Sequence, residues 1–276
     1  MSSPKDRAGR LLSHRRFINL VGQLNLRTLL CFPVGILVAT MMFGISTATA
    51  NPKERSKTIE YVADATEPAN GKLLYREKHH TTLKDGEPHT SKTVYFGPKG
   101  QKWAVLSAQY TSARDRFSHR YDDLRSGASF GVELDRAGVP VMFNRDSKEE
   151  AFERKPYRVS SNDPIAVAGQ GFHWLIRKRI LRGELKPGSS LKFRLLIPGR
   201  FDYFSFKIKT ASERSGLVYL NVTLASLFLR MIANAEMRLV YERKTGRLVE
   251  YQGPTALKDE RGREIKSVKI LYAYPE

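Results

Sequence analysis

Apolar residues recur at every second position along much of the chain beyond residue 50. The segments 191–197, 204–208 and 218–224 each alternate apolar with polar or charged residues, so an extended strand would have one apolar face. Turns that contain glycine, such as Lys84-Asp85-Gly86-Glu87 and Lys244-Thr245-Gly246-Arg247, separate these runs as hairpins require. The pattern predicts a mainly β (α+β) protein with about ten antiparallel strands.

One segment departs from this alternation. Residues 164–182 have helical spacing, with Ser161, Asn162 or Asp163 as the cap and Gly183 as the stop. A large antiparallel sheet must curl to hide its apolar face, and one helix can fill the curl. We therefore predict a single strongly curved antiparallel sheet, or half-barrel, wrapped around one central helix at about 164–182. The apolar block 225–233 fits one or two helical turns or a strand, and the charged stretch 147–155 fits a helical turn or a loop.

The first 50 residues have the pattern of an export leader. Six basic residues against one acid precede the uncharged run 29–45, and Ala48 and Ala50 match a cleavage site that would make Asn51 the first mature residue. The alternative is an uncleaved membrane anchor at residues 29–46. Both interpretations predict one exported domain, residues 51–276, in the periplasm or outside the cell. The single cysteine, Cys31, belongs to the leader, so the domain has no disulfide.

The exported domain is strongly basic. Without the six bases and one acid of the leader, the 47 Lys+Arg and 28 Asp+Glu of the chain leave a net charge of +14. Such a field favours anionic partners, an anionic lipid or an acidic envelope component, at the membrane periphery. Nucleic acid is not expected outside the cytoplasm. The alternative is a solvated basic face without a specific partner.

The predicted helix carries two apolar faces. Phe172, Leu175, Ile176 and Ile180 form one stripe, while Trp174 and Leu181 lie on the opposite side. Arg177 and Lys178 flank Trp174, and an apolar ridge bordered by cations is typical of a surface that meets lipid headgroups. The candidate ligand-binding residues are Phe172, Trp174, Arg177, Lys178, Arg179, Leu181, Arg182 and Phe228.

Arg179 is the most informative residue of this helix, because its charged side chain falls inside the main apolar stripe. A buried guanidinium without a partner is strongly unfavourable. Arg179 must therefore reach water, pair with a carboxylate or bind an anionic ligand. The backbone N–H groups of Gln170-Gly171-Phe172-His173 at the helix start also favour anions.

Catalytic and metal-binding motifs are absent beyond the leader, and we predict neither catalytic residues, a metal nor a cofactor. The histidines His79, His80 and His89 come closest to a metal site. If Asp85-Gly86 is the turn, Leu83 pairs with Pro88 and Thr82 with His89, which puts His80 and His89 diagonally on one face. Two imidazoles do not make a metal site.

The densest acids near proton carriers are Asp122 and Asp123, which follow His119, and Glu133 with Asp135. Their hydrophilic surroundings indicate solvent-facing turns. A hydrolase or transferase that acts on an envelope polymer through Asp122 or Glu133 is the second hypothesis. An assembly scaffold is the third.

The second half of the chain resembles a family of exported bacterial β-rich proteins of unknown function. The shared features are Gly171-Phe172-His173, the segment 193–197 closed by Pro198-Gly199-Arg200, the block Leu229-Arg230-Met231-Ile232, and 241–248 continuing to Tyr251-Gln252-Gly253. More distantly, the strand order is similar to the curved-sheet (half-barrel) periplasmic domains of the lipoprotein-carrier type. That resemblance implies an apolar ligand or peptide on the concave face, and it transfers no catalytic residue. Our leading hypothesis is a non-enzymatic cell-envelope protein that binds an apolar or anionic, lipid-like ligand or an envelope partner.

Overall fold

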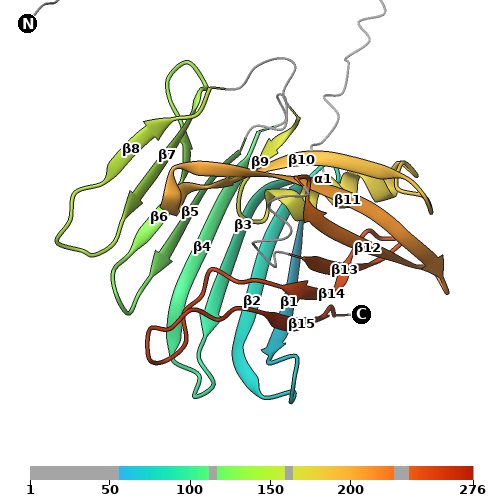
Figure 1. The fold of residues 1–276 in the computed structure, drawn as a ribbon, viewed down its shortest axis with the longest axis horizontal. Helices are drawn as coiled ribbons and strands as arrows, with labels where there is room; N and C mark the ends of the chain where they lie inside the picture. The colour runs from blue at the N-terminus through green and yellow to red at the C-terminus, as the bar shows by residue number, and fades with distance from the viewer. Residues whose placement is uncertain (1–55, 112–116, 159–163, 227–235, 276) are drawn as a thin grey trace, which may run out of the picture. The chain divides into compact units, whose positions relative to one another are not determined.

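The computed structural model describes residues 56–111, 117–158, 164–226 and 236–275 (Figure 1). These residues form fifteen strands, one α-helix and one 3-10 turn. The first eight strands are β1 (Ser56–Thr66), β2 (Leu73–Lys84), β3 (Glu87–Phe96), β4 (Lys102–Tyr110), β5 (Phe117–Asp123), β6 (Ser129–Leu134), β7 (Pro140–Arg145) and β8 (Glu153–Pro156). The remaining elements are β9 (Ala166–Val167), α1 (Gly171–Leu181), β10 (Ser190–Ile197), η1 (Pro198–Arg200), β11 (Asp202–Arg214), β12 (Leu217–Leu224), β13 (Met237–Glu242), β14 (Leu248–Gly253) and β15 (Val268–Ala273).

All fifteen strands belong to one curved, unclosed sheet, which confirms the predicted fold class. Each strand from β1 to β8 pairs with the next, and so does each strand from β9 to β15. The two halves join in the middle of the sheet, where β1 pairs with β15. The pairings are antiparallel except for β9 with β10. The sheet has more strands than the ten or so expected, because several strands of the first half do not follow simple apolar alternation.

The helix occupies only the second part of the predicted range. It begins at Gly171, whereas residues 164–182 were expected to be helical. Ala166 and Val167 instead extend the sheet as β9, with the Arg194 N–H donating to the Ile165 carbonyl at 2.8 Å. Gly169 turns the chain with φ of +49°. The predicted caps at 161–163 lie outside the described residues.

The end of the helix is as predicted. Gly183 follows it with φ of +70°, and its N–H donates to the Ile180 carbonyl at 2.9 Å. Ile176 and Ile180 are fully buried in the core, and Trp174 on the opposite side is buried as well. The helix therefore packs on both of its apolar faces. Within the described residues, no helix has the length and apolar character needed to cross a bilayer.

The turn between β2 and β3 has the predicted residues but not the predicted register. Asp85 and Gly86 both have positive φ, and Leu83 pairs with Pro88 as expected. A register shift then places Thr82 opposite Thr90 instead of His89. The diagonal arrangement of His80 and His89 is therefore wrong, because the irregularity displaces His89 from the ladder.

Two further segments had been left open. Within the charged stretch 147–155, the chain bends and then enters the exposed edge strand β8 at Glu153. In the apolar block 225–233, residues 227–233 lie outside the described residues.

Candidate ligand-binding cavity

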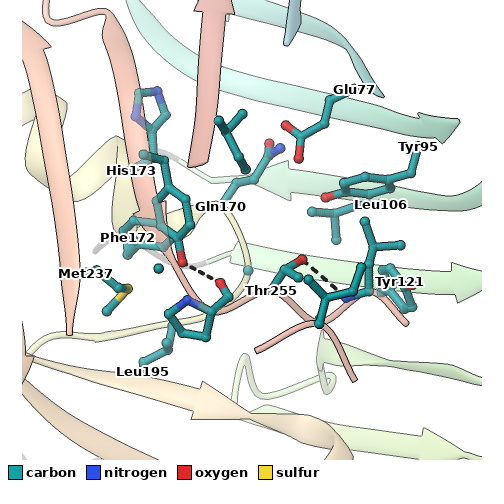
Figure 2. Close-up of a pocket in the computed structure, with 18 of the residues that line it drawn as sticks. Glu77, Tyr95, Leu106, Tyr121, Gln170, Phe172, His173, Leu195, Met237 and Thr255 are labelled. Atoms are coloured by element: carbon teal, nitrogen blue, oxygen red, sulfur yellow. Dashed lines mark hydrogen bonds between the residues drawn. The ribbon is translucent and has the colours of Figure 1, made fainter. Parts of the chain in front are cut away.

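The sheet curves around a cavity of about 1120 Å³. Its walls come from both halves of the chain: β1 to β6, the start of α1, the β10–β11 region, β13 to β15 and the loop 254–267. Figure 2 shows side chains from these elements around the cavity. Much of the lining is apolar, including Leu106, Phe130, Phe172, Leu195, Met237 and Ile270. The geometry is that of an interior able to enclose a small organic molecule.

Tyrosines form much of the remaining wall. Tyr61, Tyr75, Tyr95, Tyr121, Tyr251, Tyr272 and Tyr274 all line the cavity. Burial raises the pKa of each of these hydroxyls above its usual range. They therefore stay protonated at neutral pH and can donate hydrogen bonds.

A buried chain of polar side chains runs from the helix start onto the sheet. The Ser91 hydroxyl donates to Gln170 Oε1 at 2.7 Å, and Gln170 Nε2 donates to Thr93 Oγ1 at 2.6 Å. Thr93 Oγ1 lies 2.9 Å from His79 Nδ1, and His79 Nε2 lies 2.7 Å from Glu77 Oε2. Glu77, His79 and Gln170 face the cavity. The chain thus links the start of the helix to β3 and β2 and ends on a buried carboxylate.

Two other polar atoms in the wall have no hydrogen-bond partner among the described residues. They are Nδ1 of His119 and the hydroxyl of Tyr121, both on β5. His119 is only 4% exposed and Tyr121 only 5%. Burial lowers the pKa of His119 to about 4, so its imidazole is neutral at neutral pH. Buried groups of this kind are stabilised when a bound molecule supplies the missing hydrogen bond.

Charged residues lie where the cavity meets solvent. Six exposed charged residues line it, and we call them the cavity rim: Arg200, Arg238, Lys258, Lys266, Glu236 and Glu264. Four cations against two acids give the rim a positive balance. One of the acids is already engaged, since Glu236 pairs with Arg238 at 3.6 Å.

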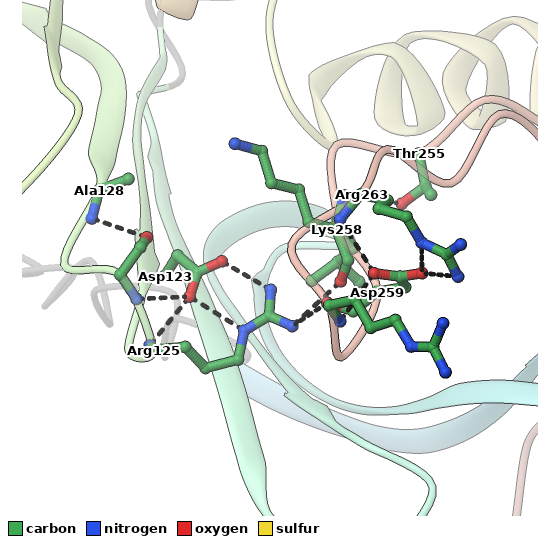
Figure 3. Close-up of polar contacts among 10 residues, drawn as sticks. Asp123, Arg125, Ala128, Thr255, Lys258, Asp259 and Arg263 are labelled. Carbon is green, nitrogen blue, oxygen red and sulfur yellow. Dashed lines mark hydrogen bonds and ion pairs between the residues drawn. The ribbon is translucent and has the colours of Figure 1, made fainter.

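The loop 254–267 closes part of the cavity and is tied to the turn after β5 (Figure 3). Arg125 Nη1 donates to the carbonyls of Lys258 and Asp259 at 3.0 and 3.1 Å, while Nη2 binds Asp123 at 2.7 Å. The guanidinium also lies 4.5 Å from the Trp103 ring centre. Burial alone would raise the pKa of Asp123, but hydrogen bonds from Arg125 and Ser126 lower it. Arg125 therefore connects the loop to the sheet, because its guanidinium pairs with Asp123 and donates hydrogen bonds to two carbonyls of the loop.

The structure places the predicted helix residues around the outside of this cavity. Of the seven candidates that the structure describes, only Phe172 lines it. Trp174 is buried against His173 and Tyr110, and Arg177 lies over its ring at 5.5 Å. Arg177 also donates to the Gly86 carbonyl at 3.3 Å.

The other candidates on the helix lie toward its end. Arg179 pairs with the carboxylate of Glu184, which is one of the three arrangements expected for it. Lys178 is part-buried, whereas Leu181 and Arg182 are exposed. Phe228 lies outside the described residues.

The predicted acids do not converge on the cavity. Asp122 pairs with Arg120 at 2.9 Å, Glu133 pairs with Arg154, and neither lines the cavity. Among the histidines, His80 faces solvent and binds Glu60 at 2.9 Å, whereas His79 points inward. In the described part of the chain, no three His, Cys, Asp or Glu side chains are grouped to hold a metal ion.

Sequence reasoning missed the most distinctive part of the site, the chain from Ser91 to Glu77. Its signal is the inward set of β2, in which Tyr75, Glu77, His79 and Thr81 follow one another at alternate positions. Polar residues at alternate positions look like the solvent face of a strand. Here they are the buried face. Comparisons with protein-family models, curated proteins and solved structures found no match to this chain.

Proposed function

We propose that this protein is a non-enzymatic binding protein that encloses a small amphiphilic molecule in the cavity of its curved sheet. The apolar body of the ligand packs against the aromatic and aliphatic lining, and an anionic group lies at the cavity rim. The leader pattern of residues 1–50 suggests that it acts outside the cytoplasm. The observation that carries the proposal is the cavity itself, about 1120 Å³ with a largely apolar and aromatic wall.

The size and lining of the cavity support binding of an organic ligand. Small-molecule sites usually measure about 300–1,000 Å³ and combine an apolar wall with a few polar groups. Here the polar groups are the tyrosine hydroxyls, Gln170 and the unpartnered atoms of His119 and Tyr121. An apolar chain transferred into such a space gains about 25 cal/mol for each Å² removed from water.

The charges favour an amphiphile over a neutral hydrocarbon. Arg200, Lys258 and Lys266 at the rim can approach an anionic group without losing their own hydration. A hydrolase of envelope glycans would instead use two carboxylates facing each other across a cleft. Asp122 and Glu133 are each engaged by an arginine away from the cavity, so the contacts favour binding over hydrolysis.

The test is to fill the cavity without changing its charge. Leu106 points into the middle of the cavity (Figure 2), and Leu106→Trp adds bulk there. We expect it to weaken binding of a fluorescent dodecanoate probe by about tenfold or more, equivalent to about 1.4 kcal/mol. Binding is measured by fluorescence titration of the purified protein.

Leu271→Trp is the matched control, because Leu271 is 53% exposed and lies outside the cavity lining. It should bind the probe as the wild type does. Circular dichroism and thermal melting establish that both variants fold. Unchanged binding by a folded Leu106→Trp variant, or no binding by the wild type, would overturn the proposal.

A further inference from the structure

We propose that the buried wall around Glu77 is a subsite for a positively charged ammonium group, with the carboxylate as its counter-ion and tyrosine rings around it. This inference rests on the proposed function and narrows the ligand to a molecule with an amine on the part that enters the cavity. An anionic group can still lie at the rim, so the complete ligand would carry charges of both signs.

Among the charged residues of the described structure that line the cavity, only Glu77 is buried. It is 6% exposed, whereas the six rim residues are all exposed. In the sheet it lies between Ala63 of β1 and Tyr95 of β3. The alanine leaves space on one side, and Figure 2 shows the Glu77 carboxylate and the Tyr95 hydroxyl directed toward the same interior.

A chain of hydrogen bonds between side chains leads to the Glu77 carboxylate, and the direction of each bond follows from the one before it. Gln170 Oε1 accepts from Ser91, so the amide nitrogen of Gln170 donates to Thr93 Oγ1. The Thr93 hydroxyl can then donate to His79 Nδ1, 2.9 Å away. With Nδ1 as acceptor, the proton of His79 is on Nε2 and points at Glu77 Oε2, 2.7 Å away.

In this arrangement Nδ1 of His79 accepts a hydrogen bond and Nε2 donates one. Gln170 Nε2 also lies 3.4 Å from His79 Nδ1, where a second N–H donor would be unfavourable and a lone pair is suitable. The four side chains therefore form a one-way relay of donors that ends on a carboxylate. Glu77 receives a hydrogen bond from His79 Nε2. Within the described residues no lysine or arginine is placed against it.

The surroundings of this carboxylate suit an organic cation. Tyr75 and Tyr95 meet edge to face with ring centres 6.1 Å apart, and Tyr61 and Tyr272 do so at the same separation. The Tyr61 ring also stacks on His79 at 4.3 Å and on Tyr274 at 4.5 Å. We therefore assign the ring faces of the subsite to Tyr75, Tyr95 and Tyr272. After burial, the charge of Glu77 is a further cause of the raised pKa of all four tyrosines, so all four rings lie within its field. Ring faces attract ammonium groups, and a nearby carboxylate strengthens the attraction.

Other occupants of the subsite are disfavoured by the same carboxylate. An anionic group would be repelled by Glu77, and a hydrocarbon chain would leave the carboxylate without water or a counter-ion. A protonated amine supplies both the charge and the hydrogen-bond donors. The subsite therefore selects ligands by charge, whereas the rest of the cavity selects them by apolar surface.

The experiment uses three probes with the same twelve-carbon chain: dodecylammonium, dodecanol and dodecanoate. Isothermal titration calorimetry at neutral pH, below the concentrations at which micelles form, measures their affinities for the full exported domain. We expect dodecylammonium to bind about tenfold more tightly than dodecanol. Glu77→Gln, which can still accept from His79 Nε2, should abolish this preference.

The matched control is Glu60→Gln. Glu60 of β1 also binds a histidine, His80 of β2, at 2.9 Å, but this pair lies on the exposed face of the sheet. It should keep the full preference for the ammonium probe. If Glu77→Gln does not fold, Tyr95→Leu provides the second variant, and it should reduce the ammonium preference by removing one ring face.

The outcomes separate the two proposals. Binding of dodecanol or dodecanoate without a preference for dodecylammonium overturns the ammonium subsite and leaves the proposed cavity function intact. A preference that survives in both folded variants at Glu77 and Tyr95 also overturns the subsite. If the wild type does not bind dodecanoate, the proposed function fails as stated above. If none of the three probes binds, the subsite fails with it.

Discussion

The helix α1 and the cavity wall formed by β2, β3 and β5 both carry charged and polar side chains, but these side chains have different partners. On the helix, His173 Nδ1 lies 3.1 Å from the Tyr241 hydroxyl, Arg177 binds the Gly86 carbonyl and Arg179 pairs with Glu184. On the wall, Glu77 receives a hydrogen bond from His79, and no lysine or arginine of the described residues pairs with it. The comparison shows that the partners of a buried polar side chain indicate its role. A side chain whose hydrogen bonds and charge are satisfied within the protein contributes to stability, whereas one that lacks such partners is a candidate for ligand binding.

The largest effect should come from the helix core. Ile176 is fully buried, and Ile176→Ala removes three carbons from a packed site. We expect the free energy of unfolding, measured by urea titration, to fall by about 2–5 kcal/mol. The dodecanoate affinity of the folded protein should not change. A loss of affinity in the folded variant would show that α1 shapes the cavity more directly than its contacts indicate.

A second, intermediate effect concerns the two buried histidines, His119 on the wall and His173 on the helix. Burial lowers their pKa values to about 4 and about 3, against about 6.5 in the unfolded chain. Their contribution to stability is complete above pH 6.5. It is lost as the pH falls below that value, because the unfolded state then binds protons that the folded state does not.

Urea titrations at a series of pH values between 7 and 4 measure this dependence. Each single variant, His119→Gln or His173→Gln, should reduce the slope by up to about 1.4 kcal/mol per pH unit. At pH 7 the helix variant should cost about 1 kcal/mol more than the wall variant, because only His173 has a hydroxyl partner to lose. Equal costs at pH 7 would contradict the difference drawn between the two regions.

The smallest effect should come from Arg179, the residue that the sequence marked most strongly. Its pair with Glu184 is partly exposed, and such pairs contribute less than about 1 kcal/mol. Arg179→Gln should therefore change the melting temperature only slightly and leave dodecanoate binding as in the wild type. A clear loss of probe binding would instead support the prediction that the cationic residues of α1 bind the ligand.

The sequence was sufficient for the fold class because burial follows alternation in the second half of the chain. Val218, Leu220, Val222 and Leu224 of β12 are all buried, as their spacing predicts. In the first half, the inward side of β2 carries Glu77, His79 and Thr81, which a solvent-facing strand could carry equally well. Only the long-range pairing with β1 and β3 decides which face is buried.

The site was less accessible to sequence reasoning than the fold. The helical period correctly placed Phe172 beside the interior, but it also included Ala166 and Val167, which form β9 of the sheet. The relay that ends at Glu77 joins β2, β3 and the residue before the helix, about 90 positions apart in the chain. No local pattern contains such a contact. Arg179 stood out because its partner, Glu184, lies beyond the helix end and outside the helical period.

The pairing of β1 with β15 has a consequence for how the protein is made. Each half of the sheet can assemble from neighbouring hairpins, but the seam between them joins segments about 200 residues apart. Of the described strands, the one synthesised last, β15, therefore completes the middle of the sheet and not its border. Until that seam closes, each half exposes a bare strand edge, and there is no enclosed space in which a ligand could be held.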